Sequence, residues 1–400
     1  MSYQRILYGY YWVQRKLSDV AEEVKGNDGR TNLPVLTISA AKGWMEQKER
    51  FSTVIAGTEL KNYTLLKQGQ LSYNHGNSKL AKYGTVFSLE SYPEALVPRV
   101  YHSFKVDGKA DSKFIEYMFA TKLPDRELGK LVSSGARMDG LLNINKSQFM
   151  GIRINVPALD EQTKISGLLA KLDDVIAANQ RKIDALKAQK SAYLERIFNQ
   201  KLRFAGFAEP WVRRHLSDIA TFSKGKGFSK SDLVSDGFPA ILYGRMYTNY
   251  ESQIDGVNDT FVADATDAVL SQTGDVIVPA SGETPEDIAR ASNVNVSGVV
   301  LGGDINIIRP DTEKMDSTFL ALTISNGQQQ TELIKRAQGK SVVHLHNSDL
   351  KKVNVLAPSK DEQSTISSLF TQLDNLIAAN QKKIELLQHQ KAAYLQKMFI

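Results

Sequence analysis

The 400 residues include no cysteine, which removes disulfides, thiolate metal ligands and thiol nucleophiles from consideration. No apolar run approaches the roughly 20 residues that a membrane-spanning helix requires. The N-terminal residues also lack the apolar stretch and small-residue cleavage site of a secretory signal. We therefore expect a cytoplasmic protein.

Nucleotide-binding and methyltransferase motifs are missing as well. The GKS at 339–341 has Ile334 where a phosphate-binding loop needs its first glycine. Gly225 and Gly227 lack the third glycine of a dinucleotide-binding turn, so they mark either a lysine-bearing phosphate contact or a solvated loop. The chain has no Pro-Pro, which excludes an N-P-P-[FY] methyltransferase signature.

Two further patterns point only weakly to chemistry. His344 and His346 form an H-x-H pair, but the chain has six histidines and no cysteine to complete a metal site. Glu59, Leu60 and Lys61 match the end of an E-x-K nuclease signature without its upstream proline and aspartate. The net charge of +6 supports a nucleic-acid partner only weakly. A chain of this length without an active-site constellation is typical of a binding scaffold.

What the chain does contain is an internal repeat. DEQTKISGLLAKLDDVIAANQRKIDALKAQKSAYLERIF (160–198) returns as DEQSTISSLFTQLDNLIAANQKKIELLQHQKAAYLQKMF (361–399), without a gap. WVQRKLSDVA (12–21) likewise returns as WVRRHLSDIA (211–220). Each half is therefore an opening segment, a diverged globular region and one long helix, so the chain is a tandem duplication.

The two long helices carry the strongest pattern. Apolar residues alternate at spacings of four and three, which predicts a coiled-coil seam. The first seam consists of Ile165, Leu169, Leu172, Ile176, Asn179, Ile183, Leu186, Lys190, Tyr193 and Ile197, and the second copy has a seam residue at each equivalent position. Asp160 and Asp361 are the expected N-caps.

Two seams in one chain most simply pair with each other, and two-fold symmetry makes the pair antiparallel. Asn179 and Asn380 lie near the helix centres, and we expect them to hydrogen-bond across the pair and fix its register; the alternative is that both are solvated. About 38 residues at ~1.5 Å each give a rod of roughly 57 Å, longer than the ~34 Å turn of B-DNA. Such a rod suits a spacer between two binding sites.

The regions between the helices predict strand-rich mixed heads, so the fold class is α+β with two heads separated by two long antiparallel helices. LPVLTISA, FPAILYGRMY, TGDVIVPAS and GVVLGGDINIIRP indicate strands, whereas SKFIEYMFATKL and STFLALTISNG indicate helices. The expected boundaries are 1–158 for the first head, 159–199 for its helix, 200–359 for the second head and 360–400 for its helix.

Candidate DNA contacts lie in the diverged heads. Asparagine, arginine and histidine read base edges, whereas lysine mainly neutralises phosphates. The candidates are Asn74, His75, Asn77, Lys79, Lys82 and Arg137 in the first head, and Lys224, Lys226, Lys230, Arg245, Lys340, His344 and Asn347 in the second.

The chain resembles the specificity subunits of type I restriction–modification enzymes over essentially its whole length. The resemblance rests on the paired P-x-x-[DE]-E-Q…I…L…L-D…I…N…L…K…L segments, on W-V-x-x-x-L-S-D-[VI]-A, and on GDVIVPASGET (274–284). It implies two target-recognition domains that each read half of a bipartite, asymmetric DNA sequence, with the helices setting the gap between the halves.

The same resemblance implies a subunit without catalysis of its own. It implies as partners two adenine-N6 methyltransferase subunits and two ATP-dependent translocating nuclease subunits, docked on the shared helices and their flanking segments. S-adenosylmethionine, ATP and Mg are expected on those partners. The alternatives are a stand-alone or orphan bivalent DNA-binding protein, a homo-oligomeric coiled-coil scaffold whose heads bind protein, and a nuclease built on the E-x-K triplet.

Overall fold

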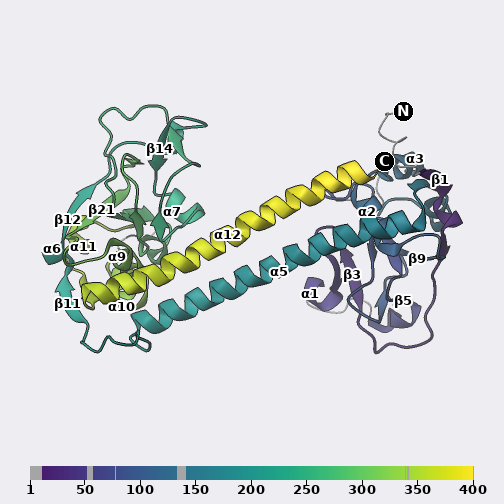
Figure 1. Cartoon of the computed structure of the whole chain (residues 1–400), viewed down its shortest axis with the longest axis horizontal. Coiled ribbons are helices and arrows are strands. Elements are labelled where there is room, and N and C mark those ends of the chain that lie inside the picture. The colour runs from purple at the N-terminus through teal and green to yellow at the C-terminus, as the bar shows by residue number, and fades with distance from the viewer. Residues whose placement is uncertain are drawn as a thin grey trace. The chain divides into compact units, whose positions relative to one another are not determined.

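The computed structural model describes residues 11–51, 57–76, 78–132, 141–337, 339 and 342–399 (Figure 1). The chain divides into two compact units. Unit 1 combines Met1–Asn179 with Lys383–Ile400, whereas unit 2 is the single stretch Gln180–Lys382. Each unit holds one head together with a portion of both long helices.

The two predicted helices are present as α5 (Leu159–Phe198) and α12 (Lys360–Met398). Their apolar seam residues are buried or half-buried, as the heptad spacing predicts. The predicted N-caps are wrong, because Asp160 and Asp361 each lie second within the helix. The hydroxyl of Ser359 instead accepts the backbone N–H of Glu362 at 3.4 Å, and the aspartates act as acidic first-turn residues beside the positive helix end.

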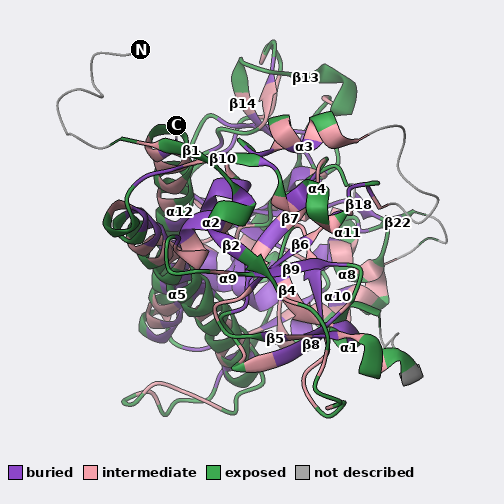
Figure 2. Cartoon of the chain, turned by 90° about the vertical axis from the view of Figure 1, so that its right-hand side faces the viewer, coloured by how far each residue is buried: buried purple, intermediate pink, exposed green. Residues whose placement is uncertain are grey.

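Head 1 is built mainly from antiparallel strands. Its described residues form a sheet in the order β2-β9-β6-β7, much of which is buried (Figure 2). Three ribbons, β1-β10, β3-β4 and β5-β8, complete the head. The strands are β1 (Val13–Lys16), β2 (Ala21–Glu23), β3 (Leu36–Ser39), β4 (Gly43–Glu46), β5 (Thr64–Lys67), β6 (Leu71–Asn74), β7 (Thr85–Ser88), β8 (Glu94–Val97), β9 (His102–Val106) and β10 (Arg153–Val156), and the helices are α1 (Gln47–Phe51), α2 (Ser112–Ala120), α3 (Asp125–Leu131) and α4 (Lys146–Met150).

Head 2 has a different sheet plan. In its described part, one sheet runs β12-β21-β17-β19-β15 and another β13-β16-β14-β20, with ribbons β11-β23 and β18-β22. The strands are β11 (Val212–His215), β12 (Ala220–Lys224), β13 (Leu233–Val234), β14 (Phe238–Ile241), β15 (Gln253–Ile254), β16 (Phe261–Val262), β17 (Asp275–Pro279), β18 (Ser281–Gly282), β19 (Ser292–Val294), β20 (Val300–Leu301), β21 (Ile305–Pro310), β22 (Val343–His344) and β23 (Asn354–Ala357), and the helices are α6 (Leu216–Ile219), α7 (Arg245–Thr248), α8 (Pro285–Ile288), α9 (Ser317–Ile324), α10 (Gly327–Arg336) and α11 (Asn347–Leu350).

The predicted heads are thus mixed and strand-rich, and the strand predictions hold except at FPAILYGRMY. There the strand ends at Ile241, and α7 takes up RMYT. No helix among the described residues is long and apolar enough to cross a membrane.

The end of each long helix is held by an aromatic cluster. In unit 2, Phe198 at the end of α5 lies 5.8 Å from Phe319 and 6.3 Å from Trp211, between ring centroids. In unit 1, Phe399, directly after α12, lies 5.0 Å from Phe114 and 6.2 Å from Trp12. These are equivalent positions of the repeat, so both halves use the same anchor.

This anchoring sets the direction of the helices within each unit. Phe399 joins the core that contains Ile165 and Leu169 from the beginning of α5. Phe198 correspondingly packs on Phe370 from the beginning of α12, with ring centroids 6.4 Å apart. The end of one helix therefore lies beside the beginning of the other in both units, which confirms the antiparallel prediction.

The glutamine of each D-E-Q motif ties the helix to its head. Gln162 accepts the backbone N–H of Asp111 at 3.0 Å and donates to the carbonyl of Pro157 at 2.9 Å. Gln363 makes the equivalent bonds to Asp316, at 2.9 Å, and Pro358, at 3.0 Å. Because both glutamines are buried, their amides need these partners, and the repeated motif has a structural explanation.

Candidate nucleic-acid interface

A glycine loop in head 2 presents three lysines. Beyond the end of β12, the N–H of Gly225 donates to the carbonyl of Ile305 at 2.9 Å, and the N–H of Lys226 donates to that of Leu301 at 3.1 Å. A Cβ at Gly225 would lie 2.0 Å from the carbonyl oxygen of Gly302, so no other residue type fits there. The loop is therefore held tightly against the sheet.

The side chains of Lys224, Lys226 and Lys230 are exposed on this loop. Within the described residues they form no hydrogen bond or ion pair. Unpaired ammonium groups on a fixed backbone suit the neutralisation of phosphates, because no acidic side chain among the described residues is paired with them.

Helix α11 brings a second group of candidates to the same edge. The side-chain amide of Asn347 donates to the carbonyl of Ser223 at 2.7 Å, next to Lys224. The ammonium of Lys351 lies 5.7 Å from the ring centroid of Phe222, also on β12. His344 is exposed on β22, which pairs with β18. Candidates more than 100 residues apart in sequence therefore meet at one edge of head 2.

In head 1, the described candidates lie around the turn after β6. Lys79 and Lys82 are exposed, and the ammonium of Lys82 lies 5.3 Å from the ring centroid of Tyr83. The amide of Asn74 is used locally, since it donates to the carbonyl of Ile38 at 3.2 Å and accepts the N–H of Gly76 at 3.0 Å. The two lysines are thus the candidates that head 1 presents to solvent here.

Two of the predicted DNA contacts lie in the interior of the heads and not on an exposed surface. Arg245 is buried, and its guanidinium donates to Asp259 at 2.9 Å and to Glu251 at 2.8 Å. His75 is buried with its ring nitrogens 2.7 Å from the carbonyl oxygen of Leu142 and 3.0 Å from that of Val100. Because these two side chains are buried and held by partners inside the heads, neither is presented to DNA.

Three candidates, Asn77, Arg137 and Lys340, lie outside the described residues. The helix-centre asparagines are described and buried. The side-chain amide of Asn179 donates to the carbonyl of Val175 at 2.7 Å, and that of Asn380 donates to Leu376 at 2.6 Å, each within its own helix. The hydrogen bond expected between these two asparagines stays a prediction.

The E-x-K triplet and the H-x-H pair are the two weak indications of enzyme chemistry in the sequence. Glu59 accepts a hydrogen bond from Asn62 at 2.7 Å within one short helical turn. The rings of His344 and His346 are parallel, with centroids 6.3 Å apart. Among the described residues, no group of three or more His, Asp or Glu side chains is arranged to hold a metal ion.

One buried histidine of head 1 was not among the predicted residues. His102 stacks against His75 with ring centroids 4.8 Å apart, and its Nε2 lies 2.8 Å from the carbonyl oxygen of Ile144. Its Nδ1 is buried without a partner in the described structure. Burial chiefly lowers the pKa of His102 to about 4, so the ring is neutral near pH 7.

We expect this histidine to make head 1 sensitive to acid. The unfolded chain binds the proton below pH ~6.5, whereas the folded head binds it only near pH 4, so the stability present above pH ~6.5 falls as the pH drops between these values. The expected loss between pH 7 and pH 5 is about 2 kcal/mol. It is measured by urea unfolding of the wild type and of His102→Gln, which keeps an N–H donor without titrating.

The exposed His215 on β11 supplies the matched control, since His215→Gln removes one histidine without touching the buried pair. The prediction fails if His102→Gln keeps the same loss of stability between pH 7 and pH 5 as the wild type.

Comparison with known proteins shows which protein family carries surfaces of this kind. The model of the type I restriction modification DNA specificity domain matches residues 11–188 and again residues 208–389. The MjaVIII specificity subunit of Methanocaldococcus jannaschii is 21% identical over 278 residues, which cover 65% of this chain and 64% of that relative. The chain thus spans slightly less than two thirds of that subunit's length. The putative MjaX specificity subunit of the same organism is 21% identical over 425 residues, covering 95% and 91%.

Two solved structures share the fold. The S subunit of a type I restriction–modification system from M. genitalium superposes with a TM-score of 0.64 at 15% identity, covering 98% of this chain and 97% of that one. A chain from a study of complex assembly and conformational transition in the type I R-M system gives 0.50 at 14% identity, covering 96% and 97%. Since the two matched segments fill most of the chain and coincide with the repeated halves, this protein belongs to the family of type I restriction–modification DNA specificity subunits.

Proposed function

We propose that this subunit reads a bipartite, asymmetric DNA sequence, with one half-site for each head. The observation that carries the proposal is the contrast between the halves. The helices, their aromatic anchors and their glutamine bonds are repeated, whereas the sheets of head 1 and head 2 differ in strand order. Two different heads on a repeated helical support suit two half-sites that differ in sequence.

Head 2 presents side chains suited to two kinds of DNA contact, one with phosphates and one with bases. The lysines of the glycine loop suit phosphates, which position a protein on DNA without carrying sequence information. Asn347 lies beside that loop, but its amide nitrogen donates to Ser223 and its Oδ1 is buried, so it is not free to pair with a base. His344 is exposed on β22, and its ring can pair with a base edge. We assign a direct base contact to His344, and phosphate contacts to Lys79 and Lys82 in head 1.

Docking of partner subunits finds support in the exposed apolar side chains of the long helices. Leu168 and Val175 of α5 are 36% and 40% exposed, while Leu376 and Leu386 of α12 are 46% and 61% exposed. Each directly precedes a seam residue, so the four flank the seam instead of filling it. Leu168 and Val175 are one heptad apart on α5, and exposed apolar side chains at this spacing suit a partner helix.

We assign the exposed apolar side chains of the long helices to the docking of two methyltransferase subunits, with two restriction and translocation subunits completing the complex. Adenine-N6 methylation and ATP-dependent cleavage then belong to those partners, as do S-adenosylmethionine, ATP and Mg, while this chain directs them without catalysis of its own. The complex works in the cytoplasm, where it meets the DNA it methylates and cleaves.

Mapping N6-methyladenine across the genome tests this function. Cells that carry the gene are expected to show one bipartite methylated motif that disappears on deletion of the gene. Replacing residues 1–157 by the first head of another family member is expected to change one half of the motif and to leave the other half unchanged. Restoring the unaltered gene is the control.

Two outcomes would count against the proposal. If no bipartite motif depends on the gene, DNA reading in this form is wrong. If the head exchange changes both halves, the heads do not read independently.

A further inference from the structure

Two lysines occupy apolar positions of the coiled-coil seam and need an explanation. Lys190 and Lys391 are equivalent residues of the repeat. In unit 2, the ammonium of Lys190 donates to Asp374 of α12 at 2.5 Å. In unit 1, Lys391 donates to Asp173 of α5 at the same distance. Each partly buried lysine therefore meets an aspartate on the opposite helix, which offsets its desolvation.

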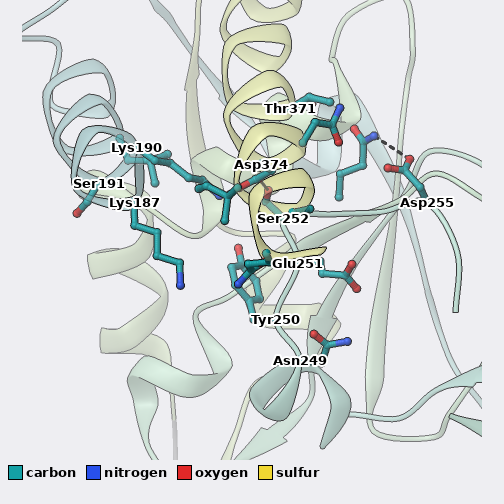
Figure 3. Close-up of a pocket in the computed structure, with 16 residues that line it drawn as sticks. Lys187, Lys190, Ser191, Asn249, Tyr250, Glu251, Ser252, Asp255, Thr371 and Asp374 are labelled. Atoms are coloured by element: carbon teal, nitrogen blue, oxygen red, sulfur yellow. Dashed lines mark hydrogen bonds and ion pairs between the residues drawn. The ribbon is translucent and has the colours of Figure 1, made fainter. Parts of the chain in front are cut away.

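The second oxygen of each aspartate is held by a head. The hydroxyl of Tyr117, on α2 of head 1, donates to Asp173 at 2.8 Å. The hydroxyl of Ser252, just before β15 of head 2, donates to Asp374 at 2.7 Å. Figure 3 shows Asp374 of α12 near both Lys190 of α5 and Ser252 of the head. Each carboxylate thus connects both helices and one head.

The two hydroxyls come from unrelated elements. Aligning the N-caps Asp111 of α2 and Asp316 of α9 places Leu322 of α9 where α2 has Tyr117. Leu322 is buried and has no hydroxyl. Head 2 nevertheless supplies a donor at the equivalent carboxylate, through Ser252. The contact is therefore retained although the element that makes it has changed.

The surroundings of Asp374 make its hydrogen bond with Ser252 important for the position of head 2. A cleft of about 580 Å³ separates the head from the helices in unit 2, and its lining includes Lys187, Asn249 and Gln381. Asp374 and Ser252 also line this cleft and join its two sides. Apolar packing does not fill this part of the boundary, so a directional hydrogen bond has a large share in fixing the angle of the head there.

We propose that Asp173 and Asp374 are positioning residues that fix the angle of each head on the helix pair and so set how strictly the gap between the half-sites is measured. This inference rests on the proposed bipartite reading. A head that can turn on its helices still recognises its own bases, but it accepts half-sites at a wrong separation.

The test measures methylation by the assembled complex on DNA duplexes with the native gap and with gaps one base pair longer or shorter. Wild-type complex is expected to prefer the native gap strongly. Ser252→Ala removes one hydrogen bond to a carboxylate and should weaken this preference about tenfold. Asp374→Asn should weaken it further, and Tyr117→Phe should act in the same way through head 1.

Matched variants separate positioning from stability. Ser252→Thr keeps the hydroxyl and should restore the strict gap. Asp184→Ala removes the hydrogen bond that the exposed Gln180 donates to the exposed Asp184 within α5, at 3.0 Å, and should have no effect. Base preference within each half-site, measured on the same duplexes with single base changes, should be unchanged in every variant.

Three results can be told apart. Unchanged gap preference in both Ser252→Ala and Asp374→Asn overturns the inference. Loss of base preference together with gap preference overturns it as well, because the bonds would then maintain the head itself. A wild-type complex that recognises no bipartite sequence refutes the proposed function instead.

Discussion

Inserting one heptad into both α5 and α12 is expected to lengthen the gap in the recognised DNA sequence. Seven residues add about 10.5 Å to a helix, which corresponds to up to about three base pairs of B-DNA. Because a heptad keeps the apolar seam in phase, the helices should still pair. Sequencing of N6-methyladenine in cells that carry the variant gives the new motif directly, and both half-sites should keep their bases.

Two controls make this result specific. Seven residues inserted at the exposed Gly206, beyond the end of α5, lengthen the chain without lengthening a helix, and the gap should not change. Two residues inserted into each helix turn the seam residues that follow by about 200°, away from the partner helix, and should abolish recognition. An unchanged gap in an active heptad variant would reject the helices as the spacer.

Replacing Phe149 by alanine is expected to remove about 3–5 kcal/mol from the stability of unit 1. Phe149 on α4 is fully buried and lies flat against Tyr73, with ring centroids 4.3 Å apart and planes inclined by 3°. It also packs near Phe104 and Phe119. Alanine would leave a cavity at the centre of this aromatic cluster.

Hydrogen exchange locates the effect. Protection should fall across the sheet of head 1 in Phe149→Ala, while head 2 keeps the protection of the wild type. Phe238→Ala serves as the comparison, because Phe238 is 50% exposed and its loss should change stability by less than about 0.5 kcal/mol. Equal loss of protection in both heads would show that the units do not unfold separately.

The long helices were predictable because their signal is local and repeated. The spacing of four and three between seam residues, sustained over many turns, specifies a coiled coil. The repeat shows this spacing in both helices. Lys190 and Lys391 were visible in the same pattern as polar residues at apolar positions, which already required a partner. The identity of that partner depends on register between distant segments, which spacing alone does not give.

The heads were less predictable for physical reasons. Their strands pair across more than 80 residues in places, as β12 does with β21, and no local pattern encodes such pairing. Arg245 lies in FPAILYGRMY, where the sequence predicts a strand. The structure instead begins α7 at Arg245, and ion pairs with Asp259 and Glu251 hold its side chain inside. Gln162 and Gln363 were conspicuous within the repeated motif, but their hydrogen bonds to the heads required the structure.

The anchoring of Phe399 in unit 1 has a consequence for synthesis of the chain. Unit 2 is one continuous stretch, so every residue of its core is made before Phe399. Unit 1 instead needs Phe399 and its neighbours beside Phe114 and Trp12, which are made hundreds of residues earlier. The head translated first is therefore the one completed last, and until then its aromatic pocket remains open to chaperones and proteases.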